Sequence, residues 1–392
     1  MLLSAKCFAA TYLGLSMTLT KRNMLETFGG KIVYNIFDSF IIDLMNLRCY
    51  AEKNMNRRAD MKKERLYHTV IVILCAVFLT AFMGGCGQRE ESVNVRVGAL
   101  KGPTSMGILF LMDKAGKGET ADTYEFQMAA AADELLPLMV KGELDIALVP
   151  ANVAAALYRK TEGGVAVIDI NTLGVLYVVT GTDEINSIAD LRGRTIYLTG
   201  KGTTPEASLR YILAANGFTE SDYILEFKSE ATEVAAVLTE NPEAVGLLPQ
   251  PFVTAALLQN DTLRVVLDMN EEWLRTGNGT EGMVTGVTVV RKAFLEEHPQ
   301  TVETFLEEHR LSAEAVNSNV EAAAVLAVEA GIVAKEPIAA QAIPKCNLTC
   351  VTGRKMKEAL SAYLNVLADF NGQLVGGSLP DDDFYYLGNE KR

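Results

Sequence analysis

The sequence predicts an α/β protein with two lobes, and two observations lead to this expectation. From Val93 onward, short apolar segments alternate with amphipathic ones. This order is typical of strand–helix units, whose parallel sheets are covered by helices on both faces. The stretch from 93 to 392 is also longer than one hydrophobic core usually serves. We therefore expect two parallel sheets, with 93–182 and 283–392 forming lobe 1 and 183–282 forming lobe 2.

The expected strands are short runs of aliphatic and β-branched residues between turns. Val93–Ala99 alternates apolar and polar residues, as a half-buried strand does. Further strands are expected at Thr123–Met128, Leu144–Val149, Val165–Ile170, Leu173–Thr180, Arg194–Leu198, Tyr223–Phe227, Ala244–Leu248, Leu263–Leu267 and Val284–Val290.

The expected helices follow these strands, and turn residues mark several of their ends. Pro150 suits the first turn of a helix, and Gly142 and Gly217 are stop signals. From Arg291 to about Phe370 we expect an almost wholly helical region, and Leu379–Phe384 starts a last short helix or turn. The other expected helices are Thr104–Lys114, Ala131–Lys141, Ala151–Arg159, Thr204–Asn216, Glu230–Thr239 and Pro251–Gln259.

The chain is expected to cross twice between the lobes. It leaves lobe 1 before the turn-rich segment 183–190 and returns through Val284–Val290. Two crossings form a natural hinge, which lets two lobes close on a ligand. The predicted architecture is therefore two lobes, a two-strand hinge and a central cleft.

The charge balance excludes one class of function. The chain has 49 Asp and Glu against 36 Lys and Arg, a net charge of −13, and the acidic excess lies after residue 85. Nucleic-acid binding depends on Lys and Arg that neutralise phosphates. We expect no nucleic-acid partner.

An export signal is expected at 61–85. Met61–Arg65 is basic, Leu66–Phe82 has no Asp, Glu, Lys or Arg, and Met83–Cys86 is small and ends in cysteine. This order is the secretory pattern, and its Gly-Gly-Cys ending resembles a bacterial lipobox, in which the cysteine becomes the lipidated first residue. The alternative is an uncleaved membrane anchor, because the apolar run is just long enough to span a bilayer.

The segments on either side of this signal carry further expectations. Residues 86–92 are expected to be a polar tether that starts at a lipidated Cys86. Residues 1–60 precede the signal and lack sustained periodicity, and Asp38 and Asp43 interrupt their most apolar run. We expect 1–60 to be a spurious or disordered extension, with Met61 (or Met55) as the true start.

Three motifs in order resemble one family of binding proteins. They are Val97–Gly107 after the first strand, Leu138–Pro150 with its Gly-Glu-Leu-Asp turn, and Ile188–Ile196 at the entry to lobe 2. In this order they are similar to the nitrate/sulfonate/taurine and thiamine-precursor (NMT1/THI5-like) group of ABC-importer binding proteins. The resemblance covers about Val93 to Phe370 and implies the two-lobed type II periplasmic-binding-protein fold.

The same resemblance implies a function and partners. It describes an extracytoplasmic receptor, anchored here to the cell membrane by lipid, that hands a small organic or anionic solute to a permease driven by a separate ATPase. The solute would be sulfonate-like or thiamine-precursor-like. Such a receptor is not an enzyme and needs no cofactor. After Cys86 only Cys346 and Cys350 remain, and they form no cluster that suits zinc or an iron–sulfur centre, so we expect no metal site. The alternatives are an enzyme on this fold, in a pyrimidine- or menaquinone-precursor pathway, and a surface sensor. Export disfavours the enzyme because such enzymes work in the cytosol.

The candidate ligand site consists of four turns that join strand ends to helix starts. Ligands of open α/β sheets bind beyond the carboxyl ends of strands, and helix starts offer unpaired N–H groups to polar or anionic ligands. A role as plain helix caps would also explain each Ser or Thr. The candidates are Pro103, Thr104, Ser105, Met106, Pro150, Asn152, Gly202, Thr203, Thr204, Pro249 and Gln250.

A glycine-rich loop, two histidines and two cysteines do not indicate catalysis. Gly200–Thr204 fits neither a Walker loop nor a dinucleotide fingerprint. His298 and His309 lie among glutamates, and we expect both to be solvated. Cys346 and Cys350 can form a small disulfide in an oxidising space or remain two buried thiols.

Overall fold

The structure is a computed structural model that describes residues 92–388. The predicted extension 1–60, the export signal 61–85, the lipidated Cys86 and the tether up to residue 91 lie outside the described residues. Among residues 92–388, no helix combines the length and the apolar character that crossing a membrane requires.

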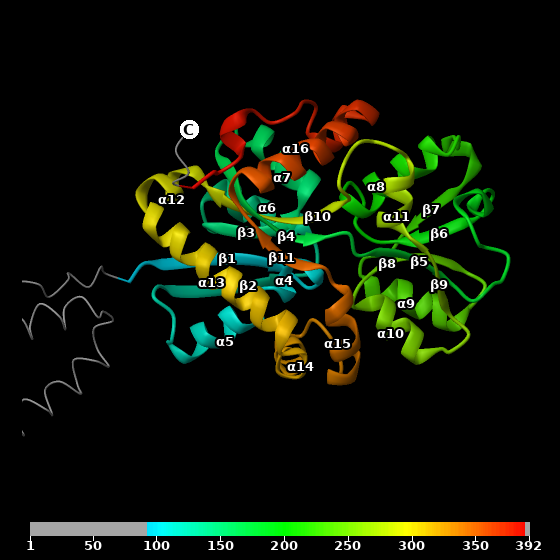
Figure 1. The fold of residues 1–392 in the computed structure, drawn as a ribbon, viewed down its shortest axis with the longest axis horizontal. Coiled ribbons are helices and arrows are strands. Elements are labelled where there is room, and N and C mark those ends of the chain that lie inside the picture. Colours follow the sequence, from blue (N-terminus) through cyan, green and yellow to red (C-terminus); the bar gives the residue numbers. More distant parts are fainter. Residues whose placement is uncertain (1–91, 389–392) are drawn as a thin grey trace, which may run out of the picture. The chain divides into compact units, whose positions relative to one another are not determined.

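The first sheet has six strands in the order β11-β4-β10-β3-β1-β2. Figure 1 shows α6, α7 and α16 on one face of this sheet and α5 and α13 on the other. The strands are β1 (Asn94–Leu100), β2 (Thr123–Ala129), β3 (Ile146–Pro150), β4 (Val165–Leu173), β10 (Val284–Arg291) and β11 (Leu348–Val351).

The helices α6 and α7 of the first lobe lie within one residue of the predicted bounds, whereas the expected helix Thr104–Lys114 is divided into α4 and α5. Gly142, with φ of 75°, ends α6 in a left-handed conformation that glycine adopts without strain. The helices are α4 (Pro103–Met106), α5 (Leu109–Lys117), α6 (Ala132–Lys141), α7 (Ala151–Lys160), α12 (Lys292–Glu297), α13 (Pro299–Ser318), α14 (Val320–Glu329), α15 (Glu336–Ala342) and α16 (Gly353–Phe370), with 3₁₀ turns η3 (Ile343–Lys345), η4 (Gly372–Val375) and η5 (Asp382–Phe384).

The second sheet has five strands in the order β7-β6-β8-β5-β9. Its strands are β5 (Leu176–Thr180), β6 (Thr195–Leu198), β7 (Ile224–Phe227), β8 (Val245–Pro249) and β9 (Arg264–Asp268), and its helices are α8 (Thr204–Ala215), α9 (Ala231–Glu240), α10 (Phe252–Gln259) and α11 (Met269–Arg275), with 3₁₀ turns η1 (Ile188–Leu191) and η2 (Glu220–Asp222). The α/β fold class with two sheets is confirmed.

Neither sheet is purely parallel, which corrects the prediction. β10 pairs antiparallel with β3 and β4, and β5 pairs antiparallel with β8 and β9. The chain enters β5 from the first sheet and enters β10 from the second lobe. Each of these two strands therefore begins at the junction between the sheets, whereas the strands paired with it end there. The first crossing also lies earlier than residue 182, because Leu176–Thr180 is a strand of the second sheet.

Two elements were not predicted. The region 291–370 is not wholly helical, because β11 pairs antiparallel with the edge of β4. Its four residues are too few for a clear alternation among long helices. α11 follows β9 directly and is capped by Asp268, whose side chain accepts hydrogen bonds from the backbone N–H groups of Asn270 and Glu271.

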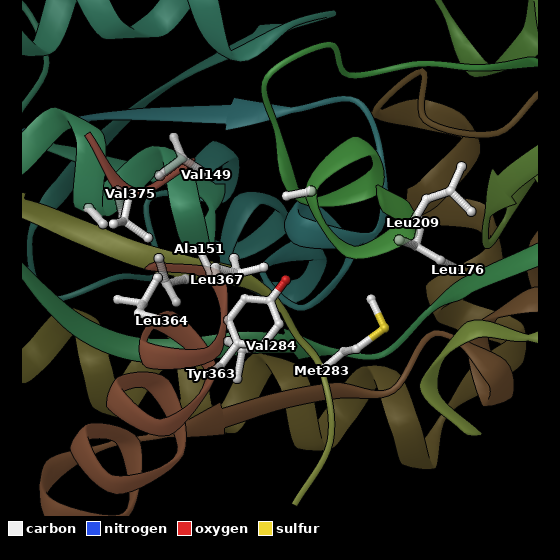
Figure 2. Close-up of a cluster of buried hydrophobic side chains, with 14 of the residues drawn as sticks. Val149, Ala151, Leu176, Leu209, Met283, Val284, Tyr363, Leu364, Leu367 and Val375 are labelled. Atoms are coloured by element: carbon white, nitrogen blue, oxygen red, sulfur yellow. The ribbon is translucent and has the colours of Figure 1, made fainter. Parts of the chain in front are cut away.

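One hydrophobic core extends across the junction between the two sheets. Val149 and Ala151 of the first lobe belong to the same buried cluster as Leu209 of α8, Val284 and Tyr363, which Figure 2 labels. The Trp273 ring of α11 lies 5.0 Å from the Tyr363 ring of α16, and both are fully buried. The two lobes are therefore packed against each other, and Trp273 of the second lobe contacts Tyr363 of the first lobe at their junction.

A buried carboxylate ties three strands of the first sheet together. Asp145, 2% exposed, accepts hydrogen bonds from the Arg96 backbone N–H (3.0 Å), both ends of the Arg96 guanidinium (2.8 and 2.6 Å) and Arg291 (2.6 Å). Burial alone raises the pKa of Asp145, but the hydrogen bonds from Arg96 and Arg291 outweigh it, so this pKa lies below its ordinary value.

We predict that Asp145→Asn lowers the free energy of unfolding by about 1.5–3 kcal/mol, the range for hydrogen bonds to a charged group. The Asp145 carboxylate makes its full contribution to the free energy of unfolding above the ordinary aspartate pKa of about 3.9. This contribution is lost as the pH falls through the lowered pKa that Asp145 has in the folded protein. Urea unfolding at pH 7 and pH 3 measures both effects. Asp113→Asn, which breaks an exposed pair with Lys117, should cost less than about 0.5 kcal/mol. Equal losses in the two variants would contradict this.

Candidate functional site

The four predicted turns gather around the two segments that connect the sheets. Three of them adjoin the second crossing at Thr285 and Gly286, and the fourth adjoins the first crossing at Val175. The four turns that the sequence proposes as a ligand site therefore meet at the junction between the lobes.

The first turn lies against Gly286. A side-chain carbon at Gly286 would lie 2.5 Å from Thr104 Cγ2 and 2.4 Å from Asn171 Oδ1. The Pro103 carbonyl accepts a hydrogen bond from the Thr172 hydroxyl at 3.4 Å. Glycine at 286 is therefore required for α4 to approach β10 this closely.

The second and third turns are joined by hydrogen bonds between the lobes. Asn152 Nδ2, at the start of α7, donates to the Gly202 carbonyl of the second lobe at 2.9 Å and to the Leu374 carbonyl at 3.1 Å. The Thr204 hydroxyl, at the start of α8, lies 3.2 Å from Asn152 Oδ1 and 3.3 Å from the Thr285 carbonyl. Pro150 precedes Asn152 and is paired with Gly286 of β10.

The fourth turn is held at the first crossing. The Gln250 backbone N–H donates to the Val175 carbonyl at 3.1 Å, and Pro249 is paired with Leu176. Gln250 Oε1 accepts from the Thr254 hydroxyl at 2.8 Å. This side-chain oxygen therefore fixes the start of α10.

Three predicted residues have local structural roles. Met106 is fully buried in a helical core, and the Cys346 thiol lies 3.6 Å from its sulfur. The Ser105 hydroxyl donates to the Gly102 carbonyl, and the Thr203 hydroxyl donates to the Gly200 carbonyl. Met106 does not face the junction, and the two hydroxyls already have partners.

Two hydroxyls at the junction are buried without a hydrogen-bond partner among the described residues. They are Thr104 Oγ1 on the first turn and Thr285 Oγ1 on the second crossing. Thr104 lies against Gly286 of β10, the chain neighbour of Thr285. A buried hydroxyl without a partner costs about 1–3 kcal/mol. Such groups are usually paired, so each of the two marks a place where a polar ligand could be held.

The polar side chains that join these turns are hydroxyls and amides. The nearest carboxylate described here is Glu206, which accepts from the Gly202 N–H at 2.7 Å and from Arg210 Nε at 2.7 Å. Tyr363 lies beside Ser208 at 2.9 Å, and burial raises the pKa of its phenol to about 12. These groups favour recognition by hydrogen bonds rather than by a basic side chain.

Trp273 does not line the site, and its role is packing. It is fully buried at the lobe junction, and its indole N–H donates to the Thr280 hydroxyl at 2.7 Å.

His309 is fully buried and not solvated, which corrects the sequence prediction. Its Nδ1 lies 3.1 Å from Asp169 Oδ2, and its ring packs beneath the α4 turn, where Nε2 would lie 3.2 Å from a side-chain carbon at Gly107. The glutamates around His309 lie on other faces of α13. Val302, Phe305 and His309 recur at the spacing of one helix face, and this face is buried. That spacing is the signal that could have identified His309 as buried.

The His309–Asp169 pair belongs to a buried polar chain that reaches the first turn. Asp169 Oδ1 accepts from the Thr288 hydroxyl at 2.9 Å, and that hydroxyl lies 3.2 Å from Asn171 Nδ2. Asn171 Oδ1 accepts from Thr172 at 2.9 Å, whose hydroxyl also contacts the Pro103 carbonyl. These residues support the site from behind, and sequence reasoning missed them.

Cys346 and Cys350 are free thiols, so the disulfide alternative is wrong. Cys346 lies at the end of η3 and faces Met106, whereas Cys350 lies on β11 and its thiol faces the Leu306 carbonyl of α13. The intervening turn at Asn347, with φ of 46°, directs the two side chains to different neighbours. Burial raises the pKa of the Cys346 thiol to about 12 and that of Cys350 further.

A separate hollow lies away from the four turns. It has a volume of about 440 Å³ and is lined by residues of α6, the α7–β4 turn and the end of β10, including Lys141, Lys160 and Arg291. This is the end of the first sheet opposite the junction, because β4 begins there and β10 ends there. The hollow is therefore not part of the predicted ligand site.

The two lobes and their junction have the fold of type II periplasmic binding proteins. Residues 163–323 match the family model described as NMT1/THI5 like. No curated protein matches the sequence. The match and the fold confirm the resemblance to the NMT1/THI5-like and sulfonate-binding group.

Solved structures share this fold. An ABC transporter protein from Parabacteroides distasonis has 24% sequence identity and a TM-score of 0.63, over 76% of this chain and 99% of that chain. The periplasmic aliphatic sulphonate binding protein SsuA from Escherichia coli has 15% identity and a TM-score of 0.61, over 76% and 94%. The alkanesulfonate-binding protein SsuA from Xanthomonas axonopodis pv. citri, bound to MOPS, has 13% identity and a TM-score of 0.58, over 74% and 96%.

We predict that Gly286→Ala lowers the free energy of unfolding by about 1–3 kcal/mol, the usual cost of overpacking. The added carbon would overlap Thr104 and Asn171, both buried. Gly102→Ala is the matched control, because that position is extended and has open space around it. Urea unfolding compares the two variants, and an unchanged Gly286→Ala protein would contradict the close approach of α4 and β10.

Proposed function

We propose that this protein is the solute-binding component of an ABC importer and that its ligand binds at the junction between the two sheets. The two buried hydroxyls without partners, Thr104 Oγ1 and Thr285 Oγ1, carry the proposal. They lie among the helix starts of α4, α7 and α8, whose free N–H groups suit a polar or anionic group. A small organic solute with hydrogen-bonding oxygens, such as a sulfonate or a thiamine precursor, fits this chemistry.

The binding step requires the lobes to separate. Thr104 is 5% exposed and Thr285 is 7% exposed, so a solute cannot reach either hydroxyl in the packed arrangement. The interlobe hydrogen bonds of Asn152 and the contact of Trp273 with Tyr363 would break on opening. The two crossings would act as the hinge. A solute that bonds to both hydroxyls would favour the closed arrangement.

The proposal includes a location and partners. The likeness of fold to periplasmic binding proteins supports an extracytoplasmic site of action. An export signal at 61–85 and lipidation at Cys86 would anchor the protein to the membrane through the tether 86–92. A membrane permease with its own ATPase would then receive the solute. No chemical step is assigned to the protein.

Ligand binding should raise the melting temperature. The purified protein is screened with alkanesulfonates, amino acids and aminopyrimidines, the first because two solved structures of this fold are sulfonate-binding proteins. A solute at about one hundred times its Kd adds about 2.7 kcal/mol to the free energy of unfolding. The single Trp273 should report opening and closing by its fluorescence. A screen in which no compound shifts the melting temperature would contradict the proposal.

Thr104→Val and Thr285→Val separate a ligand-binding role from a structural one. Each removes a hydroxyl that has no protein partner, so the ligand-free protein should be as stable as before or more so. Affinity for the best compound should fall about five- to tenfold, since a hydrogen bond contributes about 1 kcal/mol. Calorimetric titration and thermal unfolding measure the two effects.

Thr172→Val is the matched control for these variants. Its hydroxyl bonds to Asn171 and Pro103, so the substitution should destabilise the ligand-free protein. If Thr104→Val destabilises the protein equally and leaves the affinity unchanged, the Thr104 hydroxyl does not bind the solute.

Lipidation is tested on whole cells of the native host. We predict that Cys86→Ser leaves the protein out of the membrane fraction, because the serine cannot carry the anchor. Ser92→Ala, in the tether, should leave membrane association unchanged. Mass spectrometry of the native protein should find a lipidated amino terminus at Cys86. Peptides from 1–50, or membrane association that survives Cys86→Ser, would contradict this part of the proposal.

A further inference from the structure

Three potential metal ligands from distant parts of the sequence meet behind the ligand site. They are Asp169 on β4, His309 on α13 and Cys350 on β11, and one donor atom from each lies within 4.8 Å of the others. Asp169 and His309 are fully buried, and Cys350 is half-buried. The cluster lies in the first lobe where β4, β11 and α13 meet, behind the first turn.

The donor set has the chemistry of a zinc site. An imidazole nitrogen, a thiolate sulfur and a carboxylate oxygen are the ligands that Zn²⁺ takes in proteins, whereas Ca²⁺ and Mg²⁺ require oxygen ligands. Tetrahedral zinc bonds of about 2.0–2.1 Å place a nitrogen and an oxygen ligand about 3.3 Å apart. His309 Nδ1 and Asp169 Oδ2 are 3.1 Å apart, so these two donors are already at nearly the required spacing.

Among residues 92–388, the Asp169 carboxylate has two polar neighbours in this cluster. The Thr288 hydroxyl donates to Oδ1 at 2.9 Å, and His309 Nδ1 lies 3.1 Å from Oδ2. Neither neighbour carries a permanent positive charge. A buried carboxylate is costly unless a cation compensates it. Zn²⁺ with one carboxylate, one thiolate and a neutral imidazole is a cluster of zero net charge.

The surroundings orient one of the ligands, as metal sites require. The Thr288 hydroxyl donates to Asp169 Oδ1 at 2.9 Å and leaves Oδ2 directed at His309. Groups that hold a ligand in this way contribute strongly to metal affinity. The Cys350 thiol faces the Leu306 carbonyl, one turn before His309 on α13, so it lies on the side of the helix that the cluster needs.

We propose that Asp169, His309 and Cys350 bind a zinc ion that stabilises the first lobe. On binding, the Cys350 thiol proton passes to solvent, and bonds form from the metal to sulfur, nitrogen and oxygen without any change of oxidation state. The ion would stiffen the polar chain Asp169–Thr288–Asn171–Thr172 that ends at the Pro103 carbonyl of the first turn. This site is separate from the proposed solute site and does not depend on it.

The test uses the full chain and Co²⁺ as a spectroscopic probe for Zn²⁺. Because the cluster is buried, the metal is added during refolding from urea. We expect one equivalent of tightly bound Co²⁺ with the charge-transfer band of a thiolate ligand and the intense visible bands of tetrahedral geometry. Added Zn²⁺ should displace it and should raise the melting temperature by several degrees, through preferential binding to the folded state.

Cys350→Ala and Cys346→Ala are the matched variants. Cys346 is also a buried free thiol, but it lies beside Met106 and outside the cluster. Cys350→Ala should abolish the thiolate band and the stabilisation by zinc, while Cys346→Ala keeps both. Circular dichroism and the melting temperature without metal establish that each variant folds.

Three outcomes would overturn the zinc site. One is the absence of a stoichiometric cobalt spectrum in the refolded wild-type protein. Another is a spectrum that Cys350→Ala retains, which would place the metal elsewhere. The third is equal loss in Cys346→Ala and Cys350→Ala. His309→Gln provides an independent check, because it should reduce metal affinity at least tenfold while keeping a polar side chain beside Asp169.

Discussion

The two antiparallel strands that carry the chain between the sheets constrain the rest of the structure. β5 enters the second sheet directly after β4, and β10 enters the first sheet after α11. Because both begin at the junction, their antiparallel neighbours β3 and β8 end there. The strands β1 and β6, which run parallel to β3 and β8, end there too. The meeting of the four turns that leave these ends is therefore a consequence of chain connectivity, and Gly286 permits the close contact of α4 with β10.

The sequence predicted the order of strands and helices well, because short β-branched runs between glycine and proline turns are local signals. It did not predict the antiparallel direction of β5 and β10, since strand direction depends on which sheet the next segment joins. β11 was missed because its pairing with β4 comes from a distant part of the chain. The position of Leu176–Thr180 in the second sheet was missed for the same reason.

The sequence predicted which turns meet at the junction, because turn positions follow from strand ends. It did not predict which hydroxyls already have partners: those of Ser105 and Thr203 donate to backbone carbonyls three residues earlier. Thr285 was missed because it lies in a strand rather than a turn. His309 was misjudged because the charged residues beside it in sequence point to other faces of α13.

The hydrophobic core shared by the two lobes has a thermodynamic consequence. Any separation of the sheets would expose apolar side chains such as Leu176, Leu209 and Val284 to water. Closure therefore carries the negative heat-capacity change of apolar burial. Because apolar burial weakens on cooling, the closed arrangement should lose part of its advantage in the cold, even if every polar contact at the junction is unchanged.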